Sequence, residues 1–182
     1  MPAKDHDLIK QFNRGNREAF NRLVKRYMND TYNYYYSITQ DPLDADELTQ
    51  QVFVKVFKSL KNFRYQAAFS TYLYRIKVNT LNSYFSNNRW RSFLGLDQMP
   101  ELQTTDKNFD KKTLSVELWK AIEQLPKKQR SVVSLRITDN LKFKEVGEIL
   151  KISEDAAKNN YSHGIKSLQK IMGKKRWKQK TN

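Results

Sequence analysis

Two stretches of helical periodicity, separated by a segment without any, limit the fold of this chain more than any other feature. Apolar residues recur at intervals of three and four through residues 5–85 and again through residues 114–172, as they do on helices that bury one face. Residues 86–112 contain Gly95 and Pro100 and keep no period, which is typical of a linker. We therefore expect an all-α chain in which a flexible linker joins two helical domains.

The predicted organisation is uneven in charge. We expect a first domain at residues 5–85, a linker at residues 86–112, a second domain at residues 113–172 and a disordered basic tail at residues 173–182. The formal net charge is +15, and residues 113–182 carry 16 basic and 7 acidic side chains. Because each neutralised phosphate releases counterions, this balance predicts a nucleic-acid partner and makes the second domain the stronger phosphate binder.

In the first domain, a break at Gly15-Asn16 separates two short helices, and the Asp41-Pro42 turn precedes a helix at residues 44–60. The apolar stripe of that helix predicts a buried face formed by Leu48, Val52, Phe53, Val56, Phe57 and Leu60. The opposite face carries Glu47, Gln50, Gln51, Val54, Lys55 and Lys58. An exposed valine among polar side chains indicates either a contact surface or an ordinary solvated face, and the pattern alone slightly favours the solvated face.

The next helix has an aromatic entrance. Residues 62–68 break the helical period, and a helix resumes near Ser70 and runs to about Phe85. Aromatic rings beside cations suit unpaired bases, at about 1–3 kcal/mol per stacked base, although the same rings could equally form core. The rings are those of Phe63, Tyr65, Phe69 and Tyr72, and the helix adds a polar stripe of Arg75, Asn79 and Asn82 that could contact bases or phosphates.

The second domain ends in a helix-turn-helix pattern. Helices are expected to stop at Pro126 and at Asp139-Asn140, and a short helix then leads to a tight turn at Lys151-Ile152. Ser153 is the predicted N-cap of the final helix. The side chains expected on its recognition face are Lys158, Asn159, Ser162, His163 and Lys166. Any tight helical hairpin can show this pattern, but the positive charge of the domain favours a DNA-binding helix-turn-helix.

Composition argues against several other classes of protein. The chain has no cysteine and only two histidines, so neither a disulfide framework nor a metal site is expected. It also lacks a catalytic trio and a phosphate-binding glycine loop, so we predict neither an enzyme nor a cofactor. No segment approaches the roughly 18 apolar residues of a membrane span, and no signal-like apolar region begins the chain. We therefore expect a soluble, cytoplasmic protein without membrane insertion.

Several short motifs occur in a specific order along nearly the whole chain. They are Ala19-Phe20 with Leu23 and Arg26-Tyr27, residues 44–53, Phe63-Arg64, residues 69–76 with Asn79, and Leu125-Pro126 with Gln129-Arg130. In this order and spacing they resemble the extracytoplasmic-function (group 4) sigma factors of the sigma-70 family, the bacterial subunits that direct core RNA polymerase to promoters. The resemblance identifies residues 5–85 as region 2 and residues 113–172 as region 4, the helix-turn-helix domain.

The resemblance also implies three binding surfaces. Core polymerase, through the clamp helices of its largest subunit, is expected to contact Asp46, Glu47, Gln50, Gln51 and Val54. The minus-10 element is expected to be melted and read by Phe63, Arg64, Tyr65, Phe69, Ser70, Tyr72, Arg75, Asn79 and Asn82. The minus-35 element is expected to be bound by Arg136, Ser153, Lys158, Asn159, Ser162, His163 and Lys166.

The chain departs from the family pattern within the helix-turn-helix. Lys151 stands where the turn usually carries glycine, and residues 159–164 replace an arginine-rich stretch, so minus-35 specificity cannot be transferred. Gly147 and Gly164 each cost a helix up to about 1 kcal/mol relative to alanine. A close helix crossing would explain Gly147, whereas the sequence offers no reason for Gly164.

We therefore predict a non-enzymatic sigma factor whose partners are core RNA polymerase and promoter DNA. A cognate anti-sigma factor is a further partner that the resemblance leaves open. Two alternatives stay open as well. The first is a helix-turn-helix regulator that binds duplex DNA without polymerase, and the second is a decoy that sequesters core polymerase and cannot open DNA.

Overall fold

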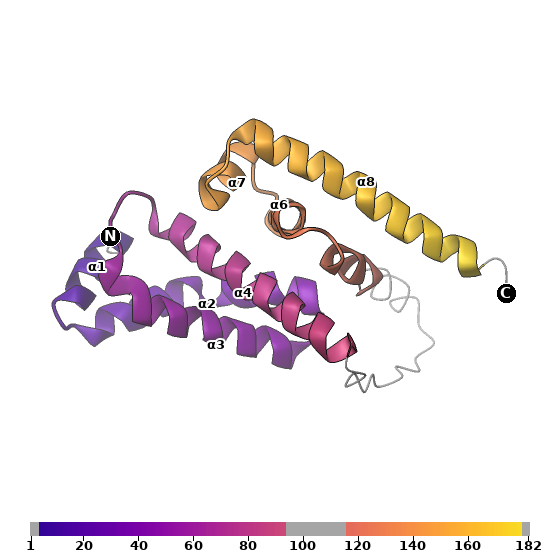
Figure 1. Cartoon of the computed structure of the whole chain (residues 1–182). Coiled ribbons are helices and arrows are strands. Elements are labelled where there is room, and N and C mark those ends of the chain that lie inside the picture. Colours follow the sequence, from indigo (N-terminus) through magenta and orange to yellow (C-terminus); the bar gives the residue numbers. More distant parts are fainter. Residues whose placement is uncertain (1–3, 94–115, 180–182) are drawn as a thin grey trace. The chain divides into compact units, whose positions relative to one another are not determined.

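The structure is a computed structural model that describes residues 4–93 and 116–179. Every regular element in these two ranges is a helix, which confirms the all-α prediction (Figure 1). The chain divides into two compact units: the first contains the residues up to Ser37 and Asp41–Leu81, and the second contains Ile38–Gln40 and the residues from Asn82 onward. None of the described helices has both the length and the apolar character that a membrane span requires.

The first unit contains three complete or nearly complete helices, a short 3-10 turn and the beginning of a further helix. Their bounds are α1 Asp5–Asn13, α2 Arg17–Thr39, α3 Pro42–Ser59, η1 Leu60–Asn62 and α4 Phe69–Phe93. The predicted break at Gly15-Asn16 is confirmed, and Gly15 has a φ of +99°, a conformation that glycine adopts without strain. α2 continues to Thr39, and its buried stripe extends from Leu23 to Ile38.

Each helix of the first unit contributes apolar side chains to one core. Leu8 of α1, Leu23 of α2 and Val52 of α3 are at most 1% exposed, as are Leu60 of η1 and Phe69 at the start of α4. Fully burying a side chain of this kind contributes about 1.5–3 kcal/mol. The core therefore provides a firm base for the outer face of α3 and for the segment that joins η1 to α4.

A local cap sets the start of α3. The Asp41 carboxylate accepts hydrogen bonds from the backbone N–H groups of Leu43 (2.8 Å) and Asp44 (3.0 Å). Pro42 occupies the first helical position, where a missing N–H group leaves no bond unmade. The helix consequently begins two residues before the predicted position.

The predicted buried stripe of α3 is confirmed with one exception. Leu48, Val52, Phe53 and Val56 are buried, as is Leu60 at the start of η1. The prediction is wrong for Phe57, which is 45% exposed. Its ring lies 5.4 Å from that of Phe12 and 5.2 Å from that of Phe20, so the three rings cover one another and leave one side of Phe57 in solvent.

α4 is longer than the sequence pattern indicated. It continues to Phe93, so residues 86–93 are helical and the predicted linker does not begin at residue 86. These residues lack an apolar period, but no glycine or proline interrupts them before Gly95. The rest of the predicted linker, residues 94–112, lies outside the described residues.

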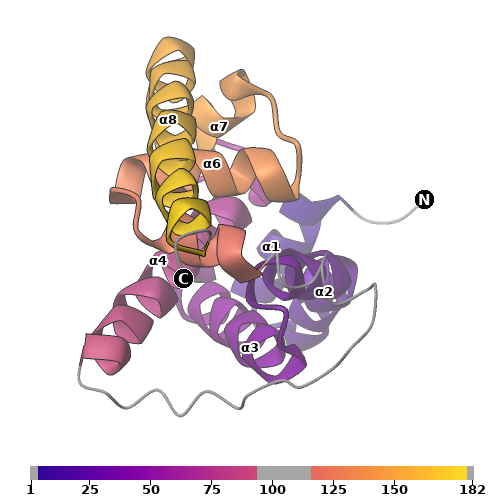
Figure 2. The ribbon, with the colours of Figure 1, turned by 90° about the vertical axis from the view of Figure 1, so that its right-hand side faces the viewer.

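The second unit consists mainly of the helix-turn-helix region and the helices beside it. Residues 116–123 are helical, and they are followed by α6 Lys127–Thr138, α7 Phe143–Leu150 and α8 Glu154–Gln179. α8 packs against both α6 and α7 (Figure 1, Figure 2). The prediction of a disordered tail from residue 173 is wrong as far as Gln179, because α8 continues to that residue.

The predicted turn between α7 and α8 is confirmed in detail. Lys151 adopts the left-handed conformation, with φ 56° and ψ 47°, that glycine adopts at many helix ends. The backbone N–H of Ile152 donates to the carbonyl of Gly147 at 3.0 Å. The Ser153 hydroxyl accepts a hydrogen bond from the backbone N–H of Ala156 at 3.1 Å, so Ser153 caps α8 as expected.

Gly164, which the sequence left unexplained, lies where α8 crosses α6. A Cβ atom added to Gly164 would lie 2.7 Å from the Val133 Cγ2 atom and 3.6 Å from the Gln129 Cβ atom. Gly164 and Val133 are both buried. The absence of a side chain at residue 164 therefore allows α8 to approach α6 closely.

We expect Gly164→Ala to lower the free energy of unfolding of the second unit by about 1–2 kcal/mol, because overpacking outweighs the better helix propensity of alanine. Urea denaturation followed by circular dichroism would measure the change. When Gly164→Ala is combined with Val133→Ala, the total loss should be smaller than the sum of the two single losses, since the second change removes the clashing methyl group. Gly173→Ala on the same helix is the control, because nothing lies within 4 Å of the added carbon. Strictly additive effects of Gly164→Ala and Val133→Ala would contradict this explanation.

Candidate functional site

The outer face of α3 presents a ladder of polar side chains between two exposed apolar ones. The Gln50 Nε2 atom donates to Asp46 Oδ2 at 2.7 Å, and Gln51 Nε2 donates to Glu47 Oε1 at 3.0 Å. All four of these side chains are exposed, and Val54 is 52% exposed. The structure therefore places the five predicted residues of this face together on one accessible surface.

Sequence reasoning missed Leu43 on this face. Leu43 is 79% exposed, the most exposed of the large apolar side chains in the described residues. Its spacing of four, seven and eleven residues before Glu47, Gln50 and Val54 places all four on one side of a helix. That spacing was visible in the sequence, but the helix was expected to begin after Leu43. An apolar side chain at each end of a polar ladder suits contact with another macromolecule.

The aromatic entrance of α4 separates into core rings and rim groups. Phe63 is 8% exposed and Phe69 only 1%, so these two rings serve mainly as packing. Around Phe63, the ring of Tyr65 lies at 5.0 Å and that of Tyr72 at 5.2 Å, and both tyrosines are half-buried. Arg64, which lies between Phe63 and Tyr65 in the sequence, is exposed. Among these residues, the groups accessible to a base are Arg64 and parts of Tyr65 and Tyr72.

The polar stripe along α4 is only partly exposed. Asn79 is exposed, and Ser70 and Arg75 are half-buried. The prediction that Asn82 shares this surface is wrong, because Asn82 is 6% exposed. Within the second unit its side-chain amide donates to the Ser131 hydroxyl at 3.0 Å and accepts from Arg130 Nε at 2.9 Å. The helical period placed Asn82 on the correct side of α4 but could not show that this turn is covered.

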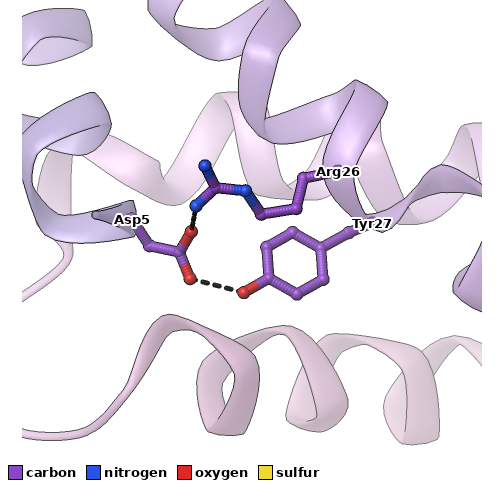
Figure 3. A network of polar contacts seen from close by, with 3 residues as sticks. All are labelled: Asp5, Arg26 and Tyr27. Atoms are coloured by element: carbon purple, nitrogen blue, oxygen red, sulfur yellow. Dashed lines mark hydrogen bonds and ion pairs between the residues drawn. The ribbon is translucent and has the colours of Figure 1, made fainter. Parts of the chain in front are cut away.

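A polar network behind the aromatic entrance was not anticipated from the sequence. The Asp5 carboxylate accepts hydrogen bonds from the Arg26 guanidinium and from the Tyr27 hydroxyl (Figure 3). The pKa of Tyr27 is raised, first because the phenol is partly buried and then because it donates to the Asp5 carboxylate. The Tyr27 ring in turn lies 5.3 Å from that of Phe69. The network joins α1 to α2 and supports the core ring at the start of α4.

The recognition face of α8 is accessible as predicted. Lys158, Asn159, Ser162, His163 and Lys166 are all exposed, and Ser153 caps the helix. Amide, hydroxyl, imidazole and ammonium groups of this kind can read base edges or contact phosphates. The Lys158 ammonium lies 2.9 Å from Glu154 and 3.6 Å from Asp155. The hydrogen bond to Glu154 is the main cause that raises the pKa of Lys158.

Arg136 has a different environment from the other residues predicted to bind the minus-35 element. Its guanidinium donates to the backbone carbonyls of Asn140 and Leu141, which follow the end of α6. It also lies 4.8 Å from the centre of the Phe143 ring and 5.9 Å from that of Tyr161. These contacts hold α6, α7 and α8 together, so the arginine has a structural use within the second unit.

Two family models match consecutive parts of the chain. The family model described as Sigma-70 region 2 matches residues 23–91, and the model described as Sigma-70, region 4 matches residues 115–168. The chain is 22% identical over 181 residues to the RNA polymerase sigma-H factor of Pseudomonas aeruginosa, covering 93% of this chain and 94% of that protein. It is 28% identical over 174 residues to the ECF RNA polymerase sigma factor SigW of Bacillus subtilis, with coverage of 89% and 93%.

The fold also resembles a solved structure. The structure of CnrH in complex with the cytosolic domain of CnrY matches with a TM-score of 0.62 and 19% sequence identity, over 93% of this chain and 97% of that chain. At this identity the likeness concerns the fold alone. Together with the two family models, it agrees with the order of helices described above.

Proposed function

Because the chain belongs to the sigma-70 family, as a sigma factor of the extracytoplasmic-function group, we propose a division of labour between its two helical units. The protein is an RNA polymerase sigma factor that binds core polymerase and directs initiation at promoters. Residues 5–85 act as region 2 and residues 113–172 as region 4, and residues 86–93 between them continue α4. The observation that supports this division most is that the two family models match in order, the first over residues 23–91 and the second over residues 115–168.

The outer face of α3 is the proposed contact with the clamp helices of core polymerase. Asp46, Glu47, Gln50, Gln51 and Val54 are exposed together, as such a contact requires. We add Leu43, since burial of its exposed side chain against a partner would contribute about 1.5–3 kcal/mol. The amide and carboxylate groups between the two apolar ends would set the register of the partner helices.

The entrance and outer stripe of α4 are the proposed reader of the minus-10 element. Arg64 and Asn79 are exposed, and Tyr65, Tyr72 and Arg75 are partly accessible, so these five can meet an unstacked base or its phosphate. Phe63 and Phe69 support them from the core, and the Ser70 backbone lies at the start of the helix. Extruding a base costs a few kcal/mol, which stacking and charge in this region can offset.

The recognition face of α8 is the proposed contact with the minus-35 element. Lys158, Asn159, Ser162, His163 and Lys166 would enter the major groove, with Ser153 beside the backbone at the helix start. We do not assign Arg136 to the DNA, because its guanidinium is held by backbone carbonyls and aromatic rings.

Three further properties belong to the proposal. Sigma factors are non-catalytic initiation factors, and we propose that this chain likewise has no enzymatic activity of its own. We place it in the cytoplasm, where core polymerase and promoter DNA are found. A cognate anti-sigma factor is a proposed regulator, and the structural relative CnrH was solved in complex with the cytosolic domain of CnrY.

Transcription by sigma-free core polymerase on fragments of the host genome tests the function directly. With the protein added, we expect discrete new start sites that share two upstream elements. Tight core binding without new starts would favour the decoy, and specific duplex binding without either would favour the helix-turn-helix regulator. The same assay identifies the promoter elements that the variants below require.

Asn79→Ala should reduce open-complex formation about tenfold, the loss expected when a base-edge contact of about 1–3 kcal/mol is removed. The affinity for core polymerase should stay unchanged, because Asn79 lies on α4 and outside the face of α3. Permanganate reactivity of promoter thymines measures opening, and a competition assay measures core binding. Wild-type permanganate reactivity would exclude Asn79 as a reader.

A further inference from the structure

We propose that His6 of α1 is a positioning residue for promoter-base capture, because its ring holds the segment at residues 63–68 in place. The inference rests on the proposed function of region 2. It concerns a residue that does not itself meet the base and that belongs to none of the predicted binding surfaces. His6 acts through Tyr65, which forms part of the accessible rim.

Ring contacts link His6 to the segment. The His6 ring lies 5.3 Å from the Tyr65 ring at an interplanar angle of 87°, an edge-to-face arrangement. It also lies 5.9 Å from the Phe63 ring at 57°. Phe63 and Tyr65 contact each other at 5.0 Å, so the three rings form a closed triangle. Edge-to-face pairs of this kind are attractive beyond the area that they bury.

The backbone of Tyr65 explains why such support is needed. Its φ of +56° lies in the left-handed region, which non-glycine residues adopt only when the surroundings hold them there. Residues on either side supply little regular structure, because η1 ends at Asn62 and α4 begins at Phe69. Within the described residues, the Tyr65 ring contacts the rings of His6 and Phe63.

α1 can present the His6 ring as a fixed group. Leu8 and Ile9 are fully buried and Phe12 is 6% exposed, so the helix is anchored in the core of the first unit. Asp5, the residue before His6, is held by Arg26 and Tyr27 of α2 (Figure 3). α1 also packs against η1, which leads directly into the segment. Because α1 is anchored in the core, the His6 ring can hold the ring of Tyr65 in a fixed position.

Loss of the His6 ring should allow Tyr65 to leave the left-handed conformation and the rim to lose its shape. Core polymerase binding should not change, because the outer face of α3 is formed by other residues. The expected effect is on recognition of the unpaired minus-10 strand, both in affinity and in discrimination between sequences.

The test uses the full-length protein assembled with core polymerase. A fluorescent single-stranded oligonucleotide carries the non-template minus-10 element found by start-site mapping, and a scrambled oligonucleotide provides the comparison. We expect His6→Ala to lower the ratio of the two affinities about fivefold, which corresponds to the loss of one or two aromatic contacts. His6→Phe, which keeps an aromatic ring, should stay within about twofold of the wild type.

Controls separate positioning from general destabilisation. Asp7→Asn changes an exposed residue of the same helix and should leave the ratio unchanged. Core affinity and melting temperature should be equal for the wild type, His6→Phe and Asp7→Asn, and core affinity should also be retained by His6→Ala. Full discrimination by His6→Ala, or failure of His6→Phe to restore it, would overturn the inference while leaving the sigma function standing. A wild-type holoenzyme that did not discriminate would instead refute the proposed minus-10 role of the α4 entrance, on which the inference rests.

Discussion

Gly147→Ala is expected to lower the free energy of unfolding of the second unit by about 3 kcal/mol, at the upper end of the usual cost of overpacking. A Cβ atom at this position would lie 2.7 Å from the backbone carbonyl oxygen of Ile152. Backbone nitrogen of Glu154 and carbonyl carbon of Ser153 lie at 3.5 Å from it. No side-chain rotation can relieve a clash with backbone, so the turn itself has to move.

Movement of this turn would affect recognition as well as stability. The turn between α7 and α8 contains the hydrogen bond from Ile152 to Gly147 and the Ser153 cap of α8. Its displacement would therefore tilt the recognition face of α8 relative to α6. We expect duplex binding at the minus-35 element to be lost together with the stability of the unit.

Urea denaturation followed by circular dichroism and a duplex-binding assay would measure the two effects of Gly147→Ala. Gly173→Ala is the matched control, because the added methyl group meets nothing within 4 Å and alanine favours the helix. A Gly147→Ala variant as stable as the wild type would show that the turn can relax at little cost. In that case, the short distance between residue 147 and the Ile152 carbonyl would not require a glycine.

The helix boundaries that sequence predicted best depend on local chemistry. Asp41 and Ser153 accept hydrogen bonds from backbone groups two or three residues away. Gly15 interrupts the helical conformation between α1 and α2 through its own positive φ angle. Interactions of such short range are visible in a sequence without knowledge of the rest of the fold. The start of α8 was therefore predicted correctly, and the start of α3 within two residues.

Features that depend on distant parts of the chain could not be predicted in the same way. Periodicity placed Asn82 on one side of α4, but only the packing of α6 decides that its amide is buried against Arg130. Gly164 had no explanation until Val133, far away in sequence, was seen beside it. The contact between His6 and Tyr65 joins the start of α1 to the segment before α4, and no short-range sequence pattern could have indicated it.

The candidate site shows the same limit. The outer face of α3 could be identified because a helical period assigns its residues to one side, and the structure adds only Leu43. The aromatic entrance of α4 could be identified as a group, but the period could not separate buried Phe63 and Phe69 from the accessible rim. Distinguishing packing from contact requires the neighbours of each ring, which the sequence alone does not provide.

The combined substitution of Glu47→Ala and Gln50→Ala should weaken binding to core polymerase about 30-fold, as expected when two central contact residues each contribute about 1 kcal/mol. The fold should remain intact, because both side chains are exposed and alanine is a strong helix former. The hydrogen bonds that disappear, from Gln50 to Asp46 and from Gln51 to Glu47, lie at the helix surface. Such pairs contribute only about 0.2–0.5 kcal/mol to a helix.

Competition with a labelled sigma factor for core polymerase would measure the loss. The matched control is Asn29→Ala with Asn33→Ala, which also removes two exposed polar side chains, here from α2. Leu43→Ser extends the test to the apolar end of the face. This substitution alone should weaken core binding, since a serine cannot replace the apolar contact that Leu43 is proposed to make with core polymerase. Unchanged core affinity in the Glu47 and Gln50 variant, with Leu43→Ser also unchanged, would mean that polymerase binds elsewhere on the protein. A loss caused by Leu43→Ser alone would instead shift the centre of the contact to the first turn of α3.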